Sequence, residues 1–375
     1  MPRSHTTNSE VKKNNRNRIF RYICRHGQVS NPDIAYALQL SLPTVLQNTR
    51  ELMSQGLVEE KGEMDSTGGR KAKALTAAAD ARLALGLDIT RNHTAFLLTN
   101  LTGDILKHQR IRMPFANERR YYAEVNSRLE SFLRECKKAD GNILGLGISL
   151  PGVVNQQKEE ITYSHVLEVE GVSFAFISGF FSWPCVFLND ANAGAYGEGI
   201  HLENDSRFFY LSLSNTVGGA VFSRGDLVLG EEFRCGEVGH MTLIPGGKRC
   251  YCGREGCVDV YCSAKRLSDY AEGKLENFFQ ELEQGNERIG EIFKEYLNDL
   301  SLVIHNIHMM LDCRIILGGY AGSYLEPYLE QLRTLVRRRS PFGENCGYIS
   351  TCRYPVEAAA YGAAMNVVEK FMSQV

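Results

Sequence analysis

The sequence predicts an α/β protein in which a small helical domain precedes a larger domain with two similar strand-rich halves. Beyond residue 83, apolar runs such as 143–150 and 314–319 alternate with helical stretches, which is the pattern of α/β folds. Before residue 76, helical periodicity recurs three times between capping residues and glycines. The 375 residues are enough for two or three domains.

Composition narrows the class of protein. Hydrophobic residues make up 43% and charged residues 23% of the chain, as in ordinary soluble proteins. No stretch approaches the roughly 18 apolar residues that span a bilayer, and the polar, basic N-terminus is not a secretory signal. Eleven cysteines, several of them isolated, favour a reducing compartment over a disulfide framework. We therefore expect a cytoplasmic protein without a membrane partner.

The N-terminal segment, residues 1–76, is predicted to bind DNA. Residues 1–75 hold 12 Lys and Arg against 7 Asp and Glu, whereas the rest holds 30 against 37, so only the small part attracts a polyanion. The first helix begins at Asn14, and Ser30 and Ser41 cap the next two. Two helices joined by a tight turn match the helix-turn-helix, whose later helix enters the major groove. The groove residues would be Leu42, Pro43, Thr44, Gln47 and Asn48.

A hairpin follows these helices. Residues 57–61 read as a strand, 62–69 as a loop and 70–75 as a returning strand. Arg70 and Lys71 on this predicted wing could contact phosphates or a narrow minor groove. The alternative is a small helical interaction module with a solvated basic face. An Ala-rich linker, 77–82, then leads into the larger domain.

The larger domain alternates strands and helices. Asn189 and Asp190 stand between a strand and a helix, where they could cap the helix or hydrogen-bond hydroxyls of a ligand. The predicted elements are strands at 83–90, 94–98, 143–150, 186–188, 208–213, 220–222 and 314–319, and helices at 117–137, 191–197, within 264–310 and at 355–372.

One cluster carries the ligand set of a metal. His240, Cys250, Cys252 and Cys257 have the spacing His-x9-Cys-x-Cys-x4-Cys. One imidazole and three thiolates complete a tetrahedral structural zinc site and leave no open position for catalytic water. The alternative is a group of ordinary buried cysteines beside an unrelated histidine. Glu237 and Asp259 flank the loop that a metal would fold.

Several motifs resemble the ROK family of repressors, open reading frames and kinases, and residues 14–75 resemble the winged helix of its repressors. The motifs are SLPGVV at 149–154, LNDANAGAYGE at 188–198, GEVGH at 236–240, CYCGREGC at 250–257 and ILGGY at 316–320. The resemblance implies two actin-like/hexokinase-like (ribonuclease H-like) lobes around a sugar cleft, in a dimer or tetramer. Lobe 1 would hold 83–190 plus 355–375, and lobe 2 would hold 191–354 with the zinc loop 236–263.

The resemblance also implies roles for single residues. Asn189, Asp190, Glu237 and His240 would contact a sugar or sugar phosphate, and His240 would also bind zinc. Gly152 would let the backbone approach the ligand. Asp259 would also contact the sugar, but it stands where the family usually has Glu, so its reach is shorter by one methylene.

The loops that hold nucleotide in the kinases are altered. Residues 88–93 contain no glycine where the kinases have an Asp-x-Gly-Gly-Thr-type loop, and 214–219 keep only the later glycines. Backbone N–H groups in glycine-rich turns cradle phosphates, so the sequence predicts no enzyme activity. We expect a sugar-responsive repressor of carbohydrate-utilisation genes that binds operator DNA as a homo-oligomer. A kinase with degenerate loops and a DNA-binding architectural protein with an inactive cleft are the alternatives.

Overall fold

The computed structural model describes residues 8–63, 73–136, 142–202, 205–343, 346–354 and 357–375. Its N-terminal domain is a winged helix. Ser30 caps the second helix in a capping box with Asp33, and Ser41 caps the third. The first helix begins six residues before the predicted Asn14, because the polar residues ahead of it continue the helix. The elements are α1 (Asn8–His26), α2 (Asn31–Leu38), α3 (Leu42–Ser54), β1 (Val58–Glu63) and β2 (Lys73–Ala77).

The predicted hairpin is present, with β1 and β2 paired antiparallel. Val58 pairs with Ala77, so Ala77 belongs to the hairpin and not to the linker. A short 3-10 helix, η1 (Ala79–Ala81), joins the hairpin to the larger domain. Ile19, Phe20 and Ile34 are fully buried in the core of the winged helix.

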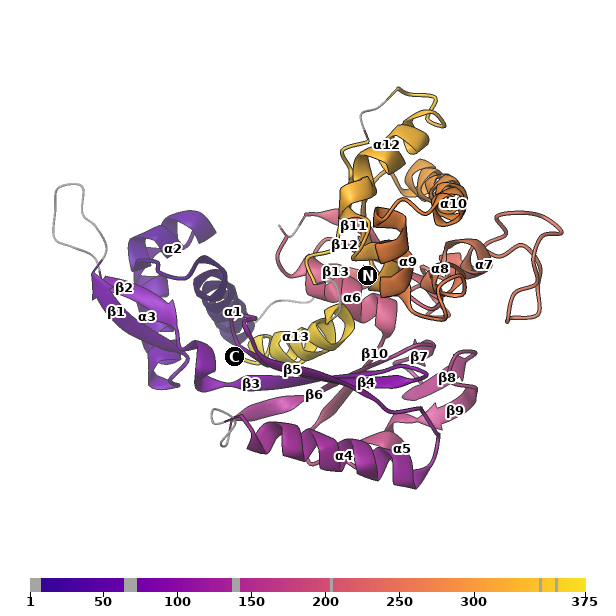
Figure 1. The fold of residues 1–375 in the computed structure, drawn as a ribbon. Coiled ribbons are helices and arrows are strands. Elements are labelled where there is room, and N and C mark those ends of the chain that lie inside the picture. The colour runs from indigo at the N-terminus through magenta and orange to yellow at the C-terminus, as the bar shows by residue number, and fades with distance from the viewer. Residues whose placement is uncertain (1–7, 64–72, 137–141, 203–204, 344–345, 355–356) are drawn as a thin grey trace.

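The first large sheet has the strand order β10-β6-β3-β4-β5. Its β3 pairs parallel with β6 and antiparallel with β4, and α4 lies along one face (Figure 1). The strands are β3 (Leu83–Ile89), β4 (His93–Asn100), β5 (Ile105–Arg112), β6 (Ile143–Leu150) and β10 (Cys185–Asn189), with helices α4 (Arg119–Arg134) and α5 (Phe174–Ser178). The strand β5 was not predicted from the sequence.

The second large sheet has the order β13-β12-β11-β14-β15. The region predicted as helical, 264–310, is divided into three helices by turns at Gly273 and Gly285, both with positive φ. The strands are β11 (Arg207–Leu213), β12 (Val217–Ser223), β13 (Asp226–Val228), β14 (Arg314–Gly318) and β15 (Ile349–Thr351). The helices are η2 (Val238–His240), α7 (Asp259–Cys262), α8 (Ala264–Ser268), α9 (Leu275–Glu283), α10 (Glu287–Leu311), α11 (Gly319–Gly322), η3 (Glu326–Tyr328) and α12 (Leu329–Arg337).

Two helices lie between the large sheets (Figure 1): α6 (Asp190–Gly199) contacts the second sheet and α13 (Ala358–Met372) the first. They also pack closely on each other, since a Cβ at Gly362 would lie 1.7 Å from the Ala193 carbonyl oxygen. On the sheet side, a Cβ at Gly147 would lie 2.0 Å from the Ala363 carbonyl oxygen. These close approaches fix α6 and α13 against each other and against the first sheet.

A small antiparallel sheet, β7-β8-β9, extends from the end of β6. Its strands are β7 (Val153–Asn155), β8 (Glu160–Ser164) and β9 (Val169–Ser173). The sequence did not predict it, because strands of three to five residues give too few alternations to define a period.

The winged helix contacts the larger domain through α1 and the end of α13. Asn17 Nδ2 donates to the Ser373 carbonyl oxygen at 3.1 Å, and Arg21 forms an ion pair with Glu369. Ile19, Phe20 and Met372 belong to one continuous apolar core. Figure 1 shows α1 beside the C-terminal end of α13. Among the described residues, no helix combines the length and the apolar character that crossing a membrane requires.

Candidate functional site

A cavity of about 530 Å³ lies between the two sheet-containing halves of the larger domain. One wall comes from the turn after β6, from β8 and from the start of α6, and the other from the start of β12 and from segment 234–254. The volume falls within the range of about 300–1,000 Å³ that is usual for small-molecule sites. The predicted ligand residues that line it are Gly152, Asn189, Asp190, Glu237 and His240.

Two carboxyl groups face this cavity. Burial raises the pKa of Asp190 above its ordinary value. The pKa of Glu237 is also raised, first by desolvation between the walls and then by the charge of Asp190, although its side chain is exposed to the cavity. Carboxyl groups that lose water in this way gain from hydroxyl donors supplied by a ligand.

Asn189 has a structural role in this arrangement. Its Oδ1 accepts hydrogen bonds from the backbone N–H groups of Ala191 and Asn192, at 2.9 and 3.1 Å, and so caps α6. Its Nδ2 donates to the Gly152 carbonyl oxygen at 3.0 Å. The cap that the sequence left open as an alternative is therefore present, and it fixes where α6 and Asp190 begin.

Gly152 lines the cavity and is also required by packing, whereas Asp259 differs from what the resemblance implied. A Cβ at Gly152, which has φ +140°, would lie 2.7 Å from the Tyr163 carbonyl oxygen, so the strand β8 alone requires a glycine there. Asp259 does not line the cavity. It is 4% exposed, and its Oδ2 accepts a hydrogen bond of 2.8 Å from the Val217 N–H. Asp259 is thus turned toward the protein, where it holds the start of β12.

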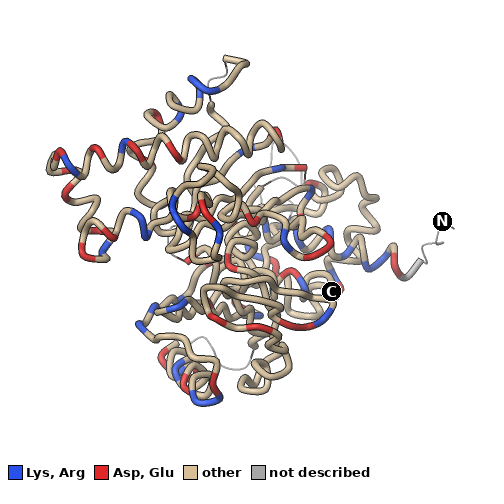
Figure 2. Tube along the Cα trace, turned by 90° about the vertical axis from the view of Figure 1, so that its right-hand side faces the viewer, with Lys and Arg blue, Asp and Glu red and all other residues tan. Residues whose placement is uncertain are grey.

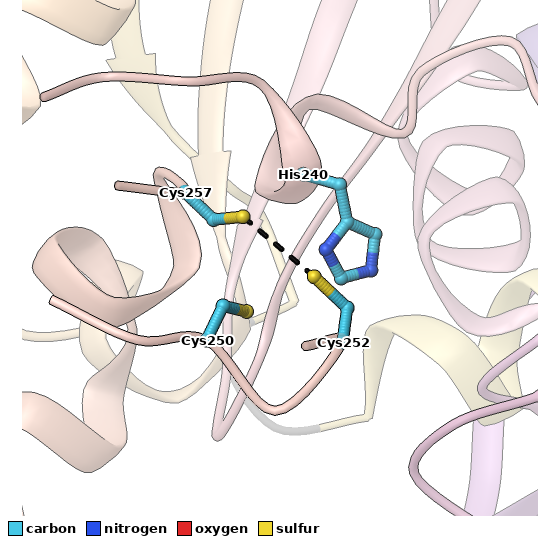
Figure 3. Close-up of side chains that lie close together, drawn as sticks. All are labelled: His240, Cys250, Cys252 and Cys257. Carbon is cyan, nitrogen blue, oxygen red and sulfur yellow. Dashed lines mark hydrogen bonds between the residues drawn. The ribbon is translucent and has the colours of Figure 1, made fainter. Parts of the chain in front are cut away.

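His240, Cys250, Cys252 and Cys257 converge as predicted (Figure 3), and their ligand atoms all lie within 4.8 Å of one another. The Sγ atoms of Cys252 and Cys257 are 3.7 Å apart. A tetrahedral zinc site with Zn–S bonds of about 2.3 Å has sulfur–sulfur edges of about 3.8 Å. His240 Nδ1 is buried and has no hydrogen-bond partner. Burial lowers the pKa of His240 and so favours the neutral ring that metals bind. The cluster fits a metal ion.

Three aromatic side chains that were not predicted surround His240. The His165 ring lies 5.7 Å from the rings of both His240 and Tyr251, and Tyr163 Oη lies 2.8 Å from His165 Nδ1. Tyr163 and His165 come from one half of the domain, and Tyr251 comes from the cysteine-containing loop 250–257 of the other half. Tyr163 and His165 were not predicted because they belong to the β7-β8-β9 region, which the sequence did not reveal. Tyr251 could have been predicted, because it stands between Cys250 and Cys252 of the cluster.

Close packing requires Gly219 in the altered loop 214–219 and also Gly236 and Gly318, which lie outside the altered loops. A Cβ at Gly219 would lie 2.3 Å from the Phe209 ring, and one at Gly236, which has φ +93°, would lie 2.3 Å from the Gly219 carbonyl oxygen. Gly318 is equally confined, because its Cβ would lie 2.1 Å from the Tyr210 hydroxyl. These contacts bring the segment that carries Glu237 onto β12.

The place where these loops meet holds a cavity of only about 80 Å³. Arg91 Nη2 lies 3.0 Å from a Glu168 carboxylate oxygen, and Arg110 donates to the Tyr320 hydroxyl at 2.6 Å. Burial, and then the charge of Asp190, raise the pKa of Asp88 in this cavity to about 7.

The predicted DNA-contacting residues divide into three groups. Leu42, Pro43 and Gln47 are exposed at the start of α3, and Thr44 is half-buried. Asn48 is only 1% exposed and its Nδ2 donates to the Thr44 carbonyl oxygen, so the prediction that it contacts bases is wrong. The predicted wing residues Arg70 and Lys71 lie outside the described residues. Figure 2 shows basic positions recurring along the helix that leads away from the N label.

The fold and cavity define a class: a winged helix-turn-helix domain joined to a two-lobed α/β domain with a cavity between its lobes. The chain belongs to the ROK family, whose sequence profile matches residues 84–370. A winged helix-turn-helix DNA-binding profile matches residues 13–59.

Several relatives are named as repressors. The xylose repressor of Bacillus spizizenii is 28% identical over 260 residues, which are 68% of this chain and 67% of the relative. A putative xylose repressor of Caldicellulosiruptor is 25% identical over 354 residues, 88% of this chain and 89% of the relative. The DNA-binding transcriptional dual regulator NagC of Escherichia coli is 24% identical over 275 residues, 72% of this chain and 67% of the relative.

Two solved structures share the fold. A ROK family transcriptional regulator, a homologue of the E. coli MLC protein, superposes with a TM-score of 0.79 at 20% identity, covering 97% of each chain. A ROK family glucokinase from Streptomyces griseus, in complex with glucose and AMPPNP, has a TM-score of 0.65 at 20% identity. It covers 76% of this chain and 98% of that chain.

Proposed function

We propose that this protein is a sugar-responsive transcriptional repressor of carbohydrate-utilisation genes. The observation that carries the proposal is the physical connection between the cavity and the winged helix. Asp190 lines the cavity and begins α6. The helix α6 packs on α13, whose far end contacts α1 of the winged helix. A ligand that moves α6 therefore acts on the DNA-binding domain.

The effector that suits the cavity is a sugar or sugar phosphate. Asp190 and Glu237 offer acceptors to neighbouring hydroxyls, and Arg234 and Arg254 in the same lining offer donors and positive charge. The rings of His165 and Tyr251 supply an apolar surface for the C–H face of a sugar ring. Asn189 is proposed to act by holding Gly152 and α6 in place, and Asp259 by holding the start of β12.

The metal that suits the His/Cys cluster is a structural zinc ion, held by His240, Cys250, Cys252 and Cys257. Bound there, it would fold the loop that carries Tyr251 and Arg254 into the cavity wall. With Nδ1 of His240 on the metal, the ring proton resides on Nε2. That atom lies 3.4 Å from the Tyr251 hydroxyl, and it would donate to a ligand oxygen.

Regulation would follow from a difference in ligand affinity between two arrangements of the lobes. Sugar bound between Asp190 and Glu237 would favour closure, and closure would displace α13 and the winged helix on it. Two such domains in a homodimer or tetramer would then no longer match two half-sites about one helical turn, or a multiple of it, apart. The shift is limited by the difference in affinity, typically about 1–3 kcal/mol.

The kinase alternative is less well supported. A cavity of about 80 Å³ at the altered loops is far smaller than the roughly 300 Å³ at which small-molecule sites begin. Arg91 and Tyr320, which line this cavity, are engaged by Glu168 and Arg110 respectively. Gly219, one of the two glycines that remain in loop 214–219, is explained by its close contact with Phe209 of β11.

A thermal-shift screen against a panel of sugars and sugar phosphates tests the function. A ligand that binds the native state raises its stability by mass action, so we expect at least one sugar to raise the melting temperature of the wild type and not of Asp190→Asn. No shift from any sugar would favour a DNA-binding protein with an inactive cleft. Consumption of ATP in the presence of the sugar would favour a kinase.

A further inference from the structure

One cysteine of the His/Cys cluster can be reached from the cavity between the lobes, the proposed sugar cleft. Cys252 is half-buried and lines this cavity of about 530 Å³, next to Tyr251. Cys250 and Cys257 are 3% and 1% exposed, and neither lines the cavity. A small solute that enters the cleft therefore meets Cys252 before the other two cysteines of the cluster.

A second sulfur atom lies close to that of Cys252. The Sγ atoms of Cys252 and Cys257 are 3.7 Å apart, and Figure 3 shows the two side chains pointing toward each other. A disulfide has an S–S bond of about 2.05 Å, so the sulfurs need to approach by less than about 2 Å.

The segment that joins the two cysteines has room for this movement. Gly253 and Gly256 lie in it, and both have positive φ. A Cβ placed at Gly253 would have no neighbouring atom within 4 Å. The backbone beside Cys252 is therefore not held by surrounding side chains, and a small rotation there meets no steric obstacle.

We propose that Cys252 is an oxidation site that hydrogen peroxide reaches through the cleft, and that Cys257 completes the reaction by forming a Cys252–Cys257 disulfide. The disulfide itself depends only on the two cysteines and on the cavity. Its protection by a bound sugar, described below, rests on the proposed function.

The reaction needs peroxide and no other oxidant. The Cys252 thiolate attacks one oxygen of hydrogen peroxide, and the O–O bond breaks to give a sulfenic acid and hydroxide. The Cys257 thiolate then attacks the Cys252 sulfur, displaces a second hydroxide and forms the S–S bond. The two sulfurs lose two electrons, peroxide gains them, and the two hydroxides take up two protons to become water.

The disulfide would undo the cluster. It removes two of the four residues that fit a metal ion, and a structural zinc site needs four ligands. The loop 250–257, which carries Tyr251 into the cavity wall, would then lose its support. Oxidation would thus abolish the response to sugar, and a thiol reductant would restore it.

Peptide mapping of the full-length protein after treatment with hydrogen peroxide tests the disulfide. Trypsin cleaves after Arg254, between the two cysteines, so the disulfide would join peptide 250–254 to peptide 255–265. We expect this joined peptide, with the bond located between Cys252 and Cys257 by fragmentation. Dithiothreitol should separate the two peptides again.

The joined peptide is expected whether or not the protein holds a metal, so failure of the zinc assignment leaves this test intact. Cys136→Ser, at a half-buried cysteine outside the cluster, should give the same yield as the wild type. Absence of the joined peptide, or a bond from Cys250 in place of Cys252, would overturn the proposal.

The sugar identified by thermal shift tests the route through the cleft. At about ten times its Kd, it leaves about a tenth of the clefts free, so the joined peptide should form about 10-fold more slowly. The same sugar should give no protection in Asp190→Asn, whose cleft does not hold it. If a sugar that binds the wild type leaves the rate unchanged, peroxide does not reach Cys252 through the cleft and the proposal is wrong. If no sugar binds, the proposed function fails and the peptide mapping still decides the disulfide.

Discussion

The guanidinium group of Arg21 in α1 forms an ion pair with the carboxylate of Glu369 in α13. This pair ties the winged helix to the helix that packs on α6, and α6 begins at the cavity residue Asp190. About one third of each side-chain surface remains exposed, 35% for Arg21 and 39% for Glu369. A pair this exposed contributes little to stability, so its significance lies in where it holds α1.

The first prediction concerns this connection. Glu369→Gln should lower the free energy of unfolding by less than about 1 kcal/mol, since exposed pairs contribute about 0.2–1 kcal/mol. It should nevertheless reduce the factor by which sugar changes operator affinity, measured by fluorescence anisotropy with and without sugar. Arg128→Gln, which breaks an exposed pair with Glu124 on α4, should leave that factor unchanged. If sugar changes operator affinity by the same factor in Glu369→Gln as in the wild type, the Arg21–Glu369 pair does not transmit the effect of sugar to the DNA-binding domain.

The second prediction concerns the metal. Protein purified without chelator should contain one zinc ion per chain by elemental analysis, and Cys257→Ser should contain much less, because Cys257 is 1% exposed inside the cluster. Loss of metal should also reduce the thermal shift produced by sugar, since the loop it folds carries Tyr251. Cys136→Ser, at a cysteine outside the cluster, serves as the control. Metal-free wild type, or full metal in Cys257→Ser, would contradict the assignment.

The third prediction concerns DNA. Gln47 is exposed at the start of α3, where side chains of a recognition helix reach base edges. Gln47→Ala should weaken binding to specific operator by about 1–3 kcal/mol and leave non-specific duplex binding nearly unchanged. Gln55→Ala, at the other end of the same helix, should bind as the wild type does. Equal operator affinity for the wild type and Gln47→Ala would show that α3 is not the reading element.

The fourth prediction concerns pH. The pKa of Asp88 rises from its ordinary 3.8 to about 7 in the folded protein, so folding favours the protonated carboxyl. The stability associated with this group is fully present below pH 3.8 and is lost as the pH rises through 7. Asp88→Asn keeps an acceptor for the Ser149 hydroxyl and cannot ionise. It should therefore match the wild type near pH 4 and be more stable at pH 8 by up to about 4 kcal/mol.

Denaturant unfolding at the two pH values measures this difference. Asp205→Asn, at an exposed carboxylate, should show the same offset from the wild type at pH 4 and pH 8. An Asp88→Asn variant that is no more stable than the wild type at pH 8 would show that Asp88 ionises without penalty.

The sequence predicted the winged helix and the convergence of the four His/Cys residues well, because both depend on local spacing. Ser30 and Ser41 are capping residues that identify helix starts without tertiary information. The four residues of the His/Cys cluster lie within 18 residues of one another in the chain, and side chains of these types at this spacing are typical of a zinc site. The long buried strands β3 and β6 were likewise predicted from their continuous apolar runs.

Features that depend on distant contacts were not predictable. Asn48 looked like a base contact by its position, yet packing against the other helices buries it. The resemblance placed Asp259 at the sugar, yet its carboxylate accepts a hydrogen bond from the Val217 N–H and does not line the cavity. Tyr163 and His165 face His240 and the cysteine-containing loop 250–257 only because the fold places β8 across the cavity from them. Nothing in the local sequence signals such approaches.

The central claim is that operator DNA and sugar bind competing arrangements of one protein. Isothermal titration of the sugar found by thermal shift, with and without saturating operator duplex, tests it most directly. We predict that operator weakens sugar affinity about 5- to 150-fold, because coupling free energies of about 1–3 kcal/mol are reciprocal. Equal sugar affinity in the two titrations would contradict the account.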